Sequence, residues 1–130
     1  MSQAVLLTEG EATIRTVVAI SLQKEYRVLP ACDADEALRV ARSQENINLL
    51  LTDVQMYGGS MSGIDLAEHI LEEKPGTKVL IMSGLPDSLA LAAEKGYPYI
   101  AKPFTATTLT KRVREILAAK IPAQAEKTTR

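Results

Sequence analysis

Three short stretches of the chain consist of apolar residues with no polar residue among them: Val5–Leu7, Leu49–Leu51 and Val79–Met82. A strand with one face in water alternates apolar and polar residues, whereas a strand buried on both faces of a parallel sheet is apolar throughout. Gly, Ser or Asp follows each stretch within a few residues, which favours strands over buried turns of helix. The three stretches therefore predict a parallel sheet that is covered on both faces.

Segments with apolar residues at helical spacing lie between these strands and after the last one. Two weaker strands are expected at Tyr26–Ala31 and Tyr97–Ala101. Asp33 and Thr105 are expected helix N-caps, and Gly96 is expected to end a helix. Strand and helix then alternate along the whole chain. This alternation predicts an α/β fold with a single doubly wound five-stranded parallel sheet, five helices and right-handed crossovers.

Length and composition exclude several classes of protein. The 130 residues suit one domain, since domains most often have about 100–150 residues. Lys and Arg (15) nearly balance Asp and Glu (16), which argues against nucleic-acid binding by bulk charge. The single cysteine, Cys32, excludes an internal disulfide and is expected to fill space after the second strand. Without a membrane-length apolar run or a signal peptide at Met1–Ala4, we expect a cytoplasmic protein with no membrane partner.

Polar residues follow four of the five expected strands at the point where each strand ends. They are Glu9, Asp53, Ser83 and Lys102. In an open parallel sheet, ligands bind beyond the carboxyl ends of the strands, where the strand order reverses. A flavodoxin-like strand order of 2-1-3-4-5 would bring these four side chains into one cleft.

The chemistry that suits this set is phosphoryl transfer. A carboxylate acts as a nucleophile and carries an acyl phosphate, and Mg²⁺ prefers carboxylate, carbonyl and water oxygens. A lysine ammonium balances phosphoryl charge, and a hydroxyl donates to a phosphoryl oxygen. No histidine is required, and the single one, His69, is expected on a helix surface.

At these positions the sequence resembles the receiver domain of two-component response regulators, over about residues 3–118. The resemblance implies that a histidine kinase or phosphotransfer protein phosphorylates Asp53, that Lys102 pairs with the phosphoryl group and that Ser83 bonds to it on activation. Tyr99 matches the aromatic residue that changes rotamer in the family's switch, and the Lys102–Pro103 bond is expected to be cis. The matching motifs are Val5–Glu9, Leu51–Met56, Met61–Gly63, Ile81–Gly84 and Lys102–Phe104.

The main departure from the family lies after the first strand. The family usually has two adjacent acids there, whereas Gly10 follows Glu9 in this chain, and Glu11 comes one residue too late. The resemblance implies a Mg²⁺ site made of Asp53, the backbone carbonyl of Gln55 and Glu9 through a water. With one acid missing, we expect weakened Mg²⁺ binding.

Two further departures concern the rim of the cleft and the lifetime of the phosphoryl group. Tyr57 stands where the family commonly has proline, and Gly58–Ser60 lengthens the turn after Asp53, which is expected to alter the cleft rim. Gln55 and Leu85 occupy the two positions that tune phosphate lifetime in the family. Because Leu85 has no polar group to position an attacking water, we expect slow autodephosphorylation.

The leading functional hypothesis is a phosphorylatable switch, a signalling domain of a phosphorelay and not a metabolic enzyme. It would alter the face made by the fourth helix, fifth strand and fifth helix, which contacts a downstream protein and is a candidate dimer interface. The alternative is a pseudo-receiver that binds proteins without phosphorylation, because Gly10 removes a metal ligand. An aspartyl phosphatase of the haloacid dehalogenase group is disfavoured, since Gln55 stands where that group has a second Asp.

The expected domain boundaries are residues 1–119 for the receiver domain and 120–130 for a flexible tail or a truncated linker. Apolar periodicity stops at about Lys120. The sequence leaves open whether the chain acts alone or belongs to a longer regulator or hybrid kinase.

Overall fold

The computed structural model describes residues 2–56 and 61–119, and its strands form one five-stranded parallel sheet with the order β2-β1-β3-β4-β5. This order confirms the predicted flavodoxin-like α/β fold. The predictions for the Tyr57–Ser60 loop and for residues 120–130 lie outside the described residues. The strands are β1 Ala4–Thr8, β2 Arg27–Ala31, β3 Leu49–Asp53, β4 Lys78–Ser83 and β5 Tyr99–Ala101.

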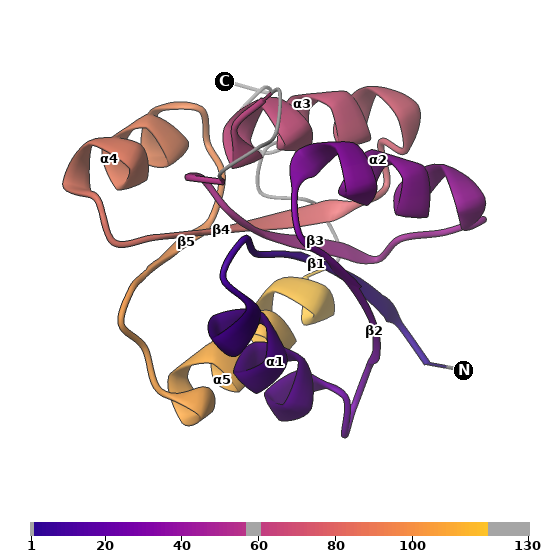
Figure 1. The fold of residues 1–130 in the computed structure, drawn as a ribbon, viewed down its shortest axis with the longest axis horizontal. Helices are drawn as coiled ribbons and strands as arrows, with labels where there is room; N and C mark the ends of the chain where they lie inside the picture. The colour runs from indigo at the N-terminus through magenta and orange to yellow at the C-terminus, as the bar shows by residue number, and fades with distance from the viewer. Residues whose placement is uncertain (1, 57–60, 120–130) are drawn as a thin grey trace.

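The helices of the described residues cover the sheet on both faces, with α1 and α5 on one face and α2, α3 and α4 on the other (Figure 1). Each helix connects two neighbouring strands in the chain or follows the last one. Within the described part of the chain, no helix has both the length and the apolar character needed to cross a membrane. The helices are α1 Ala12–Leu22, α2 Ala34–Ser43, α3 Gly63–Glu73, α4 Pro86–Glu94 and α5 Ala106–Ala118.

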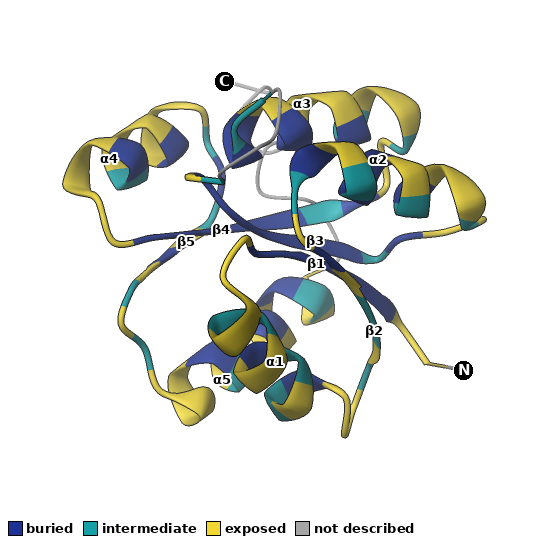
Figure 2. Ribbon diagram, in the orientation of Figure 1, coloured by how far each residue is buried: buried dark blue, intermediate teal, exposed yellow. Residues whose placement is uncertain are grey.

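The unbroken apolar strands are explained by two cores, one on each face of the sheet. In β3, Leu49 and Leu51 pack in the core beneath α1 and α5, whereas Leu50 packs in the core beneath α2 and α3. Because successive side chains of a strand point to opposite faces, a strand with a core on each side has no solvent-facing position. Figure 2 shows the result, with the central strands β1, β3 and β4 buried and the helices exposed on their outer sides.

The predicted helix ends are confirmed. The Asp33 carboxylate accepts a hydrogen bond from the amide of Glu36, and the Thr105 hydroxyl accepts one from the amide of Thr108. Gly96, just beyond α4, has φ 84°, a left-handed conformation that favours glycine. These local signals fix where α2 and α5 begin and where the chain leaves α4.

Two weaker strands begin later than predicted, and the prediction for Cys32 is wrong. The amide of Tyr26 still donates to Leu22 O in the turn that ends α1, so β2 starts one residue later. The amide of Tyr97 donates to Ala92 O and Pro98 has no amide hydrogen, so β5 starts at Tyr99. Cys32 is exposed beyond the end of β2 and fills no space in a core.

Candidate functional site

Three of the predicted site residues meet at the carboxyl ends of the strands. Lys102, just after β5, places its Nζ 2.6 Å from Glu9 Oε1 and 2.9 Å from Asp53 Oδ2. Glu9 follows β1 and Asp53 ends β3, and these two strands are neighbours because the strand order reverses between β1 and β3. The parallel topology thus brings two carboxylates from distant parts of the chain into hydrogen-bonding contact with one lysine ammonium.

These charges are held away from water. Glu9 is 2% exposed and Asp53 is 8% exposed. Burial disfavours the ammonium of Lys102, but its hydrogen bonds to Glu9 and Asp53 outweigh burial, so the pKa of Lys102 lies above its ordinary value. Buried charges are stable only when they are paired, so this cluster is an electrostatic unit and not a set of surface residues.

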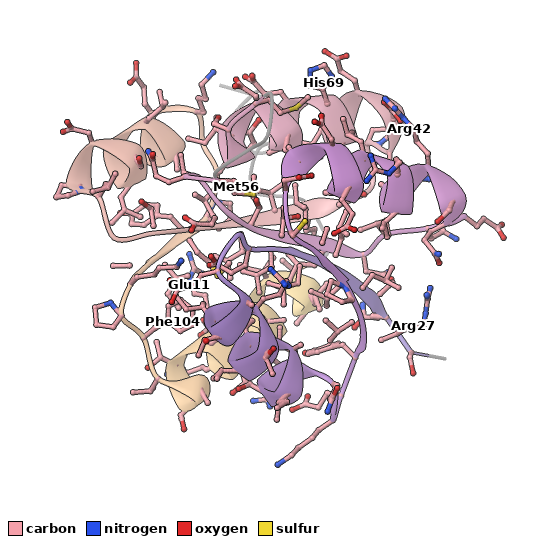
Figure 3. All side chains as sticks on the ribbon, in the orientation of Figure 1. Glu11, Arg27, Arg42, Met56, His69 and Phe104 are labelled. Carbon is pink, nitrogen blue, oxygen red and sulfur yellow. The ribbon has the colours of Figure 1, made fainter. Side chains whose placement is uncertain are left out.

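The turn from β1 into α1 holds the second carboxylate oxygen of Glu9. Glu9 Oε2 accepts a hydrogen bond of 3.1 Å from the amide of Glu11, which is the N-cap residue of α1. The side chain of Glu11 caps no amide of α1 and is exposed. Figure 3 shows Glu11 at the start of α1 and His69 on α3, on the opposite face of the sheet from α1. His69 is exposed, as predicted.

The backbone of Asp53 and Val54 is held by two residues whose roles the sequence did not reveal. The Thr52 hydroxyl donates to Asp53 O at 2.8 Å, and Gly63 at the start of α3 donates its amide to Val54 O. A Cβ at Gly63 would lie 1.8 Å from Asp53 O, so only glycine permits this approach of α3 to β3. A polar residue at the end of an apolar strand is the one sequence signal for Thr52.

The amide of Gln55 donates a hydrogen bond of 3.4 Å to Asp53 Oδ1, whereas Ser83 and Tyr99 lie near the cluster without a described contact to Asp53. Ser83 ends β4, and its hydroxyl accepts a hydrogen bond of 3.0 Å from the amide of Leu85. Its carbonyl accepts one from the amide of Lys102. The Lys102–Pro103 peptide bond that follows is cis, as expected. Tyr99 begins β5 and is 44% exposed. Ser83 keeps a hydroxyl hydrogen to donate, and Tyr99 has room to change rotamer.

Fewer than three acidic side chains among the described residues of this site are available as ligands for a metal ion. Asp53 supplies a carboxylate at the edge, Gln55 is exposed beside it, and Glu9 is engaged by Lys102 and the amide of Glu11. Among residues 2–56 and 61–119, no group of three or more His, Cys, Asp or Glu side chains could hold a metal ion. Oxygen donors of this type fit Mg²⁺, but the set is one carboxylate short.

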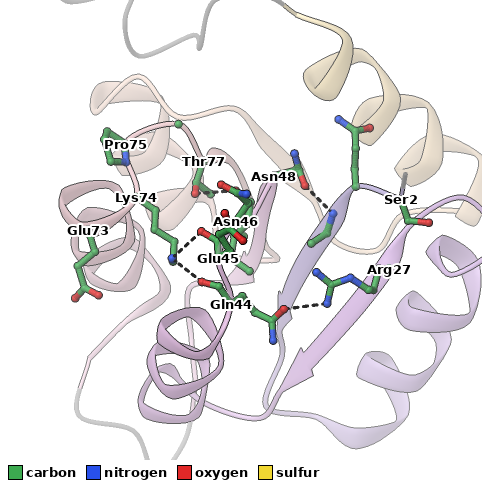
Figure 4. Close-up of a pocket in the computed structure, with 14 residues that line it drawn as sticks. Ser2, Arg27, Gln44, Glu45, Asn46, Asn48, Glu73, Lys74, Pro75 and Thr77 are labelled. Carbon is green, nitrogen blue, oxygen red and sulfur yellow. Dashed lines mark hydrogen bonds between the residues drawn. The ribbon is translucent and has the colours of Figure 1, made fainter.

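A groove of about 980 Å³ lies at the opposite end of the sheet, at the amino ends of the strands (Figure 4). Two of its polar side chains, Lys74 and Asn48, are paired with the main chain. Lys74 Nζ donates to the carbonyls of Gln44 and Glu45, and Asn48 Oδ1 accepts from the amide of Ala4. Because its lysine is bound to main-chain carbonyls, this groove offers no reactive cluster comparable to that at the carboxyl edge.

Comparison with known proteins gives a consistent result along nearly the whole chain. The model of the response regulator receiver domain matches residues 5–114. The nitrogen assimilation regulatory protein NtrX of Azorhizobium caulinodans is 32% identical over 124 residues, which cover 90% of this chain and 27% of that protein. The sensor histidine kinase TmoS of Ectopseudomonas mendocina is 31% identical over 93% of this chain and 13% of its own length. The chain thus spans less than a third of these relatives.

Solved structures agree with the sequence comparisons. NtrX from Brucella abortus in complex with ATP superposes with a TM-score of 0.82 at 27% identity, over 90% of this chain and 27% of that one. A receiver domain protein (CheY-like) from Methanospirillum hungatei superposes with a TM-score of 0.80 at 25% identity, over 90% of this chain and 94% of that one.

Proposed function

The chain belongs to the family of response regulator receiver domains, which are signalling domains and not metabolic enzymes, and we propose that it accepts a phosphoryl group on Asp53. The donor is a phosphohistidine of a histidine kinase or of a phosphotransfer protein. The observation that carries the proposal is the half-buried Lys102 ammonium, 2.9 Å from Asp53 Oδ2 and 2.6 Å from Glu9 Oε1, at the edge of the sheet where ligands bind.

The transfer needs no general base from this chain. One Asp53 carboxylate oxygen forms a bond to phosphorus while the P–N bond of the phosphohistidine breaks, and the electron pair of that bond returns to the imidazole nitrogen. The negative charge of the carboxylate passes to the acyl phosphate, so no proton leaves Asp53. Lys102 already contacts Asp53 Oδ2, so it is placed to balance the charge of the phosphoryl oxygens.

Receiver domains in general bind Mg²⁺ at their acidic pocket. In this chain Asp53 and the Gln55 carbonyl would hold the ion directly, and Glu9 would contribute through a water. When bound, Mg²⁺ neutralises phosphoryl charge. Its affinity is weaker than that of a pocket with two adjacent acids, because Gly10 supplies no carboxylate.

Phosphorylation would shift the domain between two conformations through Ser83 and Tyr99. Ser83 would turn its hydroxyl to a phosphoryl oxygen, and Tyr99 would change rotamer. Both residues adjoin α4, and Tyr99 with the exposed Leu85 and Leu91 offers apolar surface there. The face of α4, β5 and α5 would then bind a downstream protein or a second copy of the chain. Leu85, apolar and exposed, would leave the acyl phosphate slow to hydrolyse.

Phosphoryl uptake is tested with acetyl phosphate and Mg²⁺, followed by intact mass spectrometry. The expected result is a gain of one phosphoryl group by the parent protein and no gain by Asp53→Asn. Asp33→Asn is a suitable control, because Asp33 also follows a strand but caps α2 and has no contact with Lys102 among the described hydrogen bonds. A gain that survives Asp53→Asn would contradict the proposal.

The second candidate function is a pseudo-receiver that keeps the fold and binds partners without phosphorylation. The missing acid at Gly10 is the observation that favours it. In that case the parent protein takes up no phosphoryl group even at saturating Mg²⁺, whereas Gly10→Asp does. Uptake by the parent protein at millimolar Mg²⁺ would eliminate this candidate.

A further inference from the structure

We propose that Arg15 is a positioning residue that holds Glu9, and through it Lys102, in place across a turn that contains Gly10. Arg15 lies one turn into α1 and is half-buried. Its Nη1 donates a hydrogen bond of 2.8 Å to the main-chain carbonyl of Glu9. This inference rests on the proposed function, because Glu9 matters there through Lys102.

Arg15 contacts the turn on both sides of Gly10. Its side chain binds the carbonyl of Glu9, and its own amide donates to the carbonyl of Glu11 at 2.9 Å. The amide of Glu11 in turn donates to Glu9 Oε2. Gly10 is therefore enclosed by hydrogen bonds that all begin or end on Glu9, Glu11 or Arg15.

The remaining polar groups of Glu9 connect this turn to the cluster. The amide of Glu9 donates to Ala31 O at the end of β2, and its Oε1 accepts from Lys102. The backbone and the carboxylate of Glu9 thus both form hydrogen bonds. Among the described side chains, the one that binds the Glu9 carbonyl is Arg15, through its guanidinium. A shift of this carbonyl would move the carboxylate that orients Lys102.

The glycine makes such a contact necessary. Gly10 is exposed, and glycine has more backbone freedom than any other residue type. The turn at Gly10 is therefore held only through the residues on either side of it, Glu9 and Glu11. A guanidinium hydrogen bond to a carbonyl is a strong restraint, because the donor is charged and always protonated. Arg15 therefore supplies the order that the turn itself lacks.

The test compares Arg15→Gln and Arg15→Lys with the control Arg39→Gln, an exposed arginine on α2. The first readout is the rate of phosphoryl uptake from acetyl phosphate. We expect Arg15→Gln to slow uptake about tenfold, because the variant loses one hydrogen bond from a charged donor. Arg15→Lys keeps the positive charge and an N–H donor, so it should recover part of the rate. Arg39→Gln should take up phosphoryl groups at the rate of the parent protein.

The second readout is amide hydrogen exchange in the unphosphorylated protein, which does not depend on the proposed function. In Arg15→Gln the amide of Glu11 should exchange about tenfold faster, while the amide of Leu50 in the sheet should be unchanged. Faster exchange at both sites would show a general loss of stability and would overturn the proposal. So would a slower uptake with unchanged exchange at Glu11.

The two readouts separate this inference from the proposed function. If the parent protein takes up no phosphoryl group, the proposed function fails, and exchange at Glu11 still decides whether Arg15 holds the turn. If the parent protein is phosphorylated on Asp53 but Arg15→Gln behaves like Arg39→Gln in both readouts, the proposed function stands and the role of Arg15 is refuted.

Discussion

The two ends of the sheet hold their lysines in different ways. At the carboxyl end, Lys102 binds the carboxylates of Glu9 and Asp53, whereas at the amino end Lys74 binds the main-chain carbonyls of Gln44 and Glu45. A main-chain carbonyl is uncharged and is not a nucleophile, so the contacts of Lys74 tie loops together. A carboxylate can bind a metal ion or attack phosphorus, so the partners of Lys102 can change during a reaction.

Two buried threonines, Thr77 and Thr8, differ in whether their hydroxyls are paired. The Thr77 hydroxyl at the amino end donates to Ile47 O at 2.9 Å. The Thr8 hydroxyl, at the carboxyl end of β1, is fully buried and has no hydrogen-bond partner among the described residues. An unpaired buried polar group costs stability, so the Thr8 hydroxyl is unfavourable, whereas the hydroxyls of Thr77 and of Thr52, which lies at the same edge of the sheet as Thr8, are paired.

Replacing the two lysines should separate these roles most clearly. Lys102→Met should slow phosphoryl uptake by about 10²–10³-fold, since it removes the charge that stabilises the transferring group. Lys74→Met should leave uptake unchanged and lower the free energy of unfolding by about 1–2 kcal/mol, because two carbonyls lose a charged donor. Uptake rates and urea denaturation measure both effects. Equal uptake by the two variants would contradict the comparison.

Two glycines extend the comparison to the backbone. Gly63→Ala should lower the free energy of unfolding by about 3 kcal/mol or more, since its Cβ would lie 1.8 Å from Asp53 O. Gly76, near the amino end, has open space around its Cβ position, so Gly76→Ala should change stability by less than about 1 kcal/mol. Urea denaturation of both variants checks this prediction. A similar loss for both would mean that α3 has freedom to move away from β3.

The sheet and the strand-end placement of the site residues could be predicted from the sequence further than the contacts around the site could. Unbroken apolar runs arise because a strand between two cores has no wet position, so β1, β3 and β4 were recognisable. The strand-end position of Asp53 and Lys102 followed from topology alone. The contacts of Thr52 and Arg15 could not be foreseen, because they depend on side-chain direction and on how closely α1 and α3 approach the strands. Cys32 was expected to fill space because cysteine is usually buried, but this residue lies exposed just beyond the end of β2.

Restoring the missing acid should strengthen metal binding at the carboxyl end alone. Gly10→Asp should raise the Mg²⁺ affinity about tenfold or more, since an added carboxylate supplies a direct ligand. Isothermal titration of Mg²⁺ into the apo protein measures this without any phosphorylation. Asn46→Asp, in the groove at the amino end, is the matched control and should not change the affinity. An unchanged affinity in Gly10→Asp would mean that the pocket differs from the family in more than one ligand.

The smallest effects are expected at the two threonines, with opposite signs. Thr77→Val should lower the free energy of unfolding by about 1 kcal/mol or more, because Ile47 O loses its donor. Thr8→Val should leave stability unchanged or raise it by up to about 1 kcal/mol, since it removes an unpaired buried hydroxyl. Thermal unfolding followed by circular dichroism compares the two. A loss in Thr8→Val as large as that in Thr77→Val would show that the Thr8 hydroxyl has a partner.

The most direct test of the central claim is to find the atom that carries the phosphoryl group. The protein is treated with acetyl phosphate and Mg²⁺, reduced with borohydride, which converts an acyl phosphate to an alcohol, and mapped by tandem mass spectrometry. The account predicts that Asp53 alone is reduced, and that Lys102→Met lowers the yield. Reduction at another carboxylate, or no reduction in the parent protein while Gly10→Asp is reduced at Asp53, would contradict it.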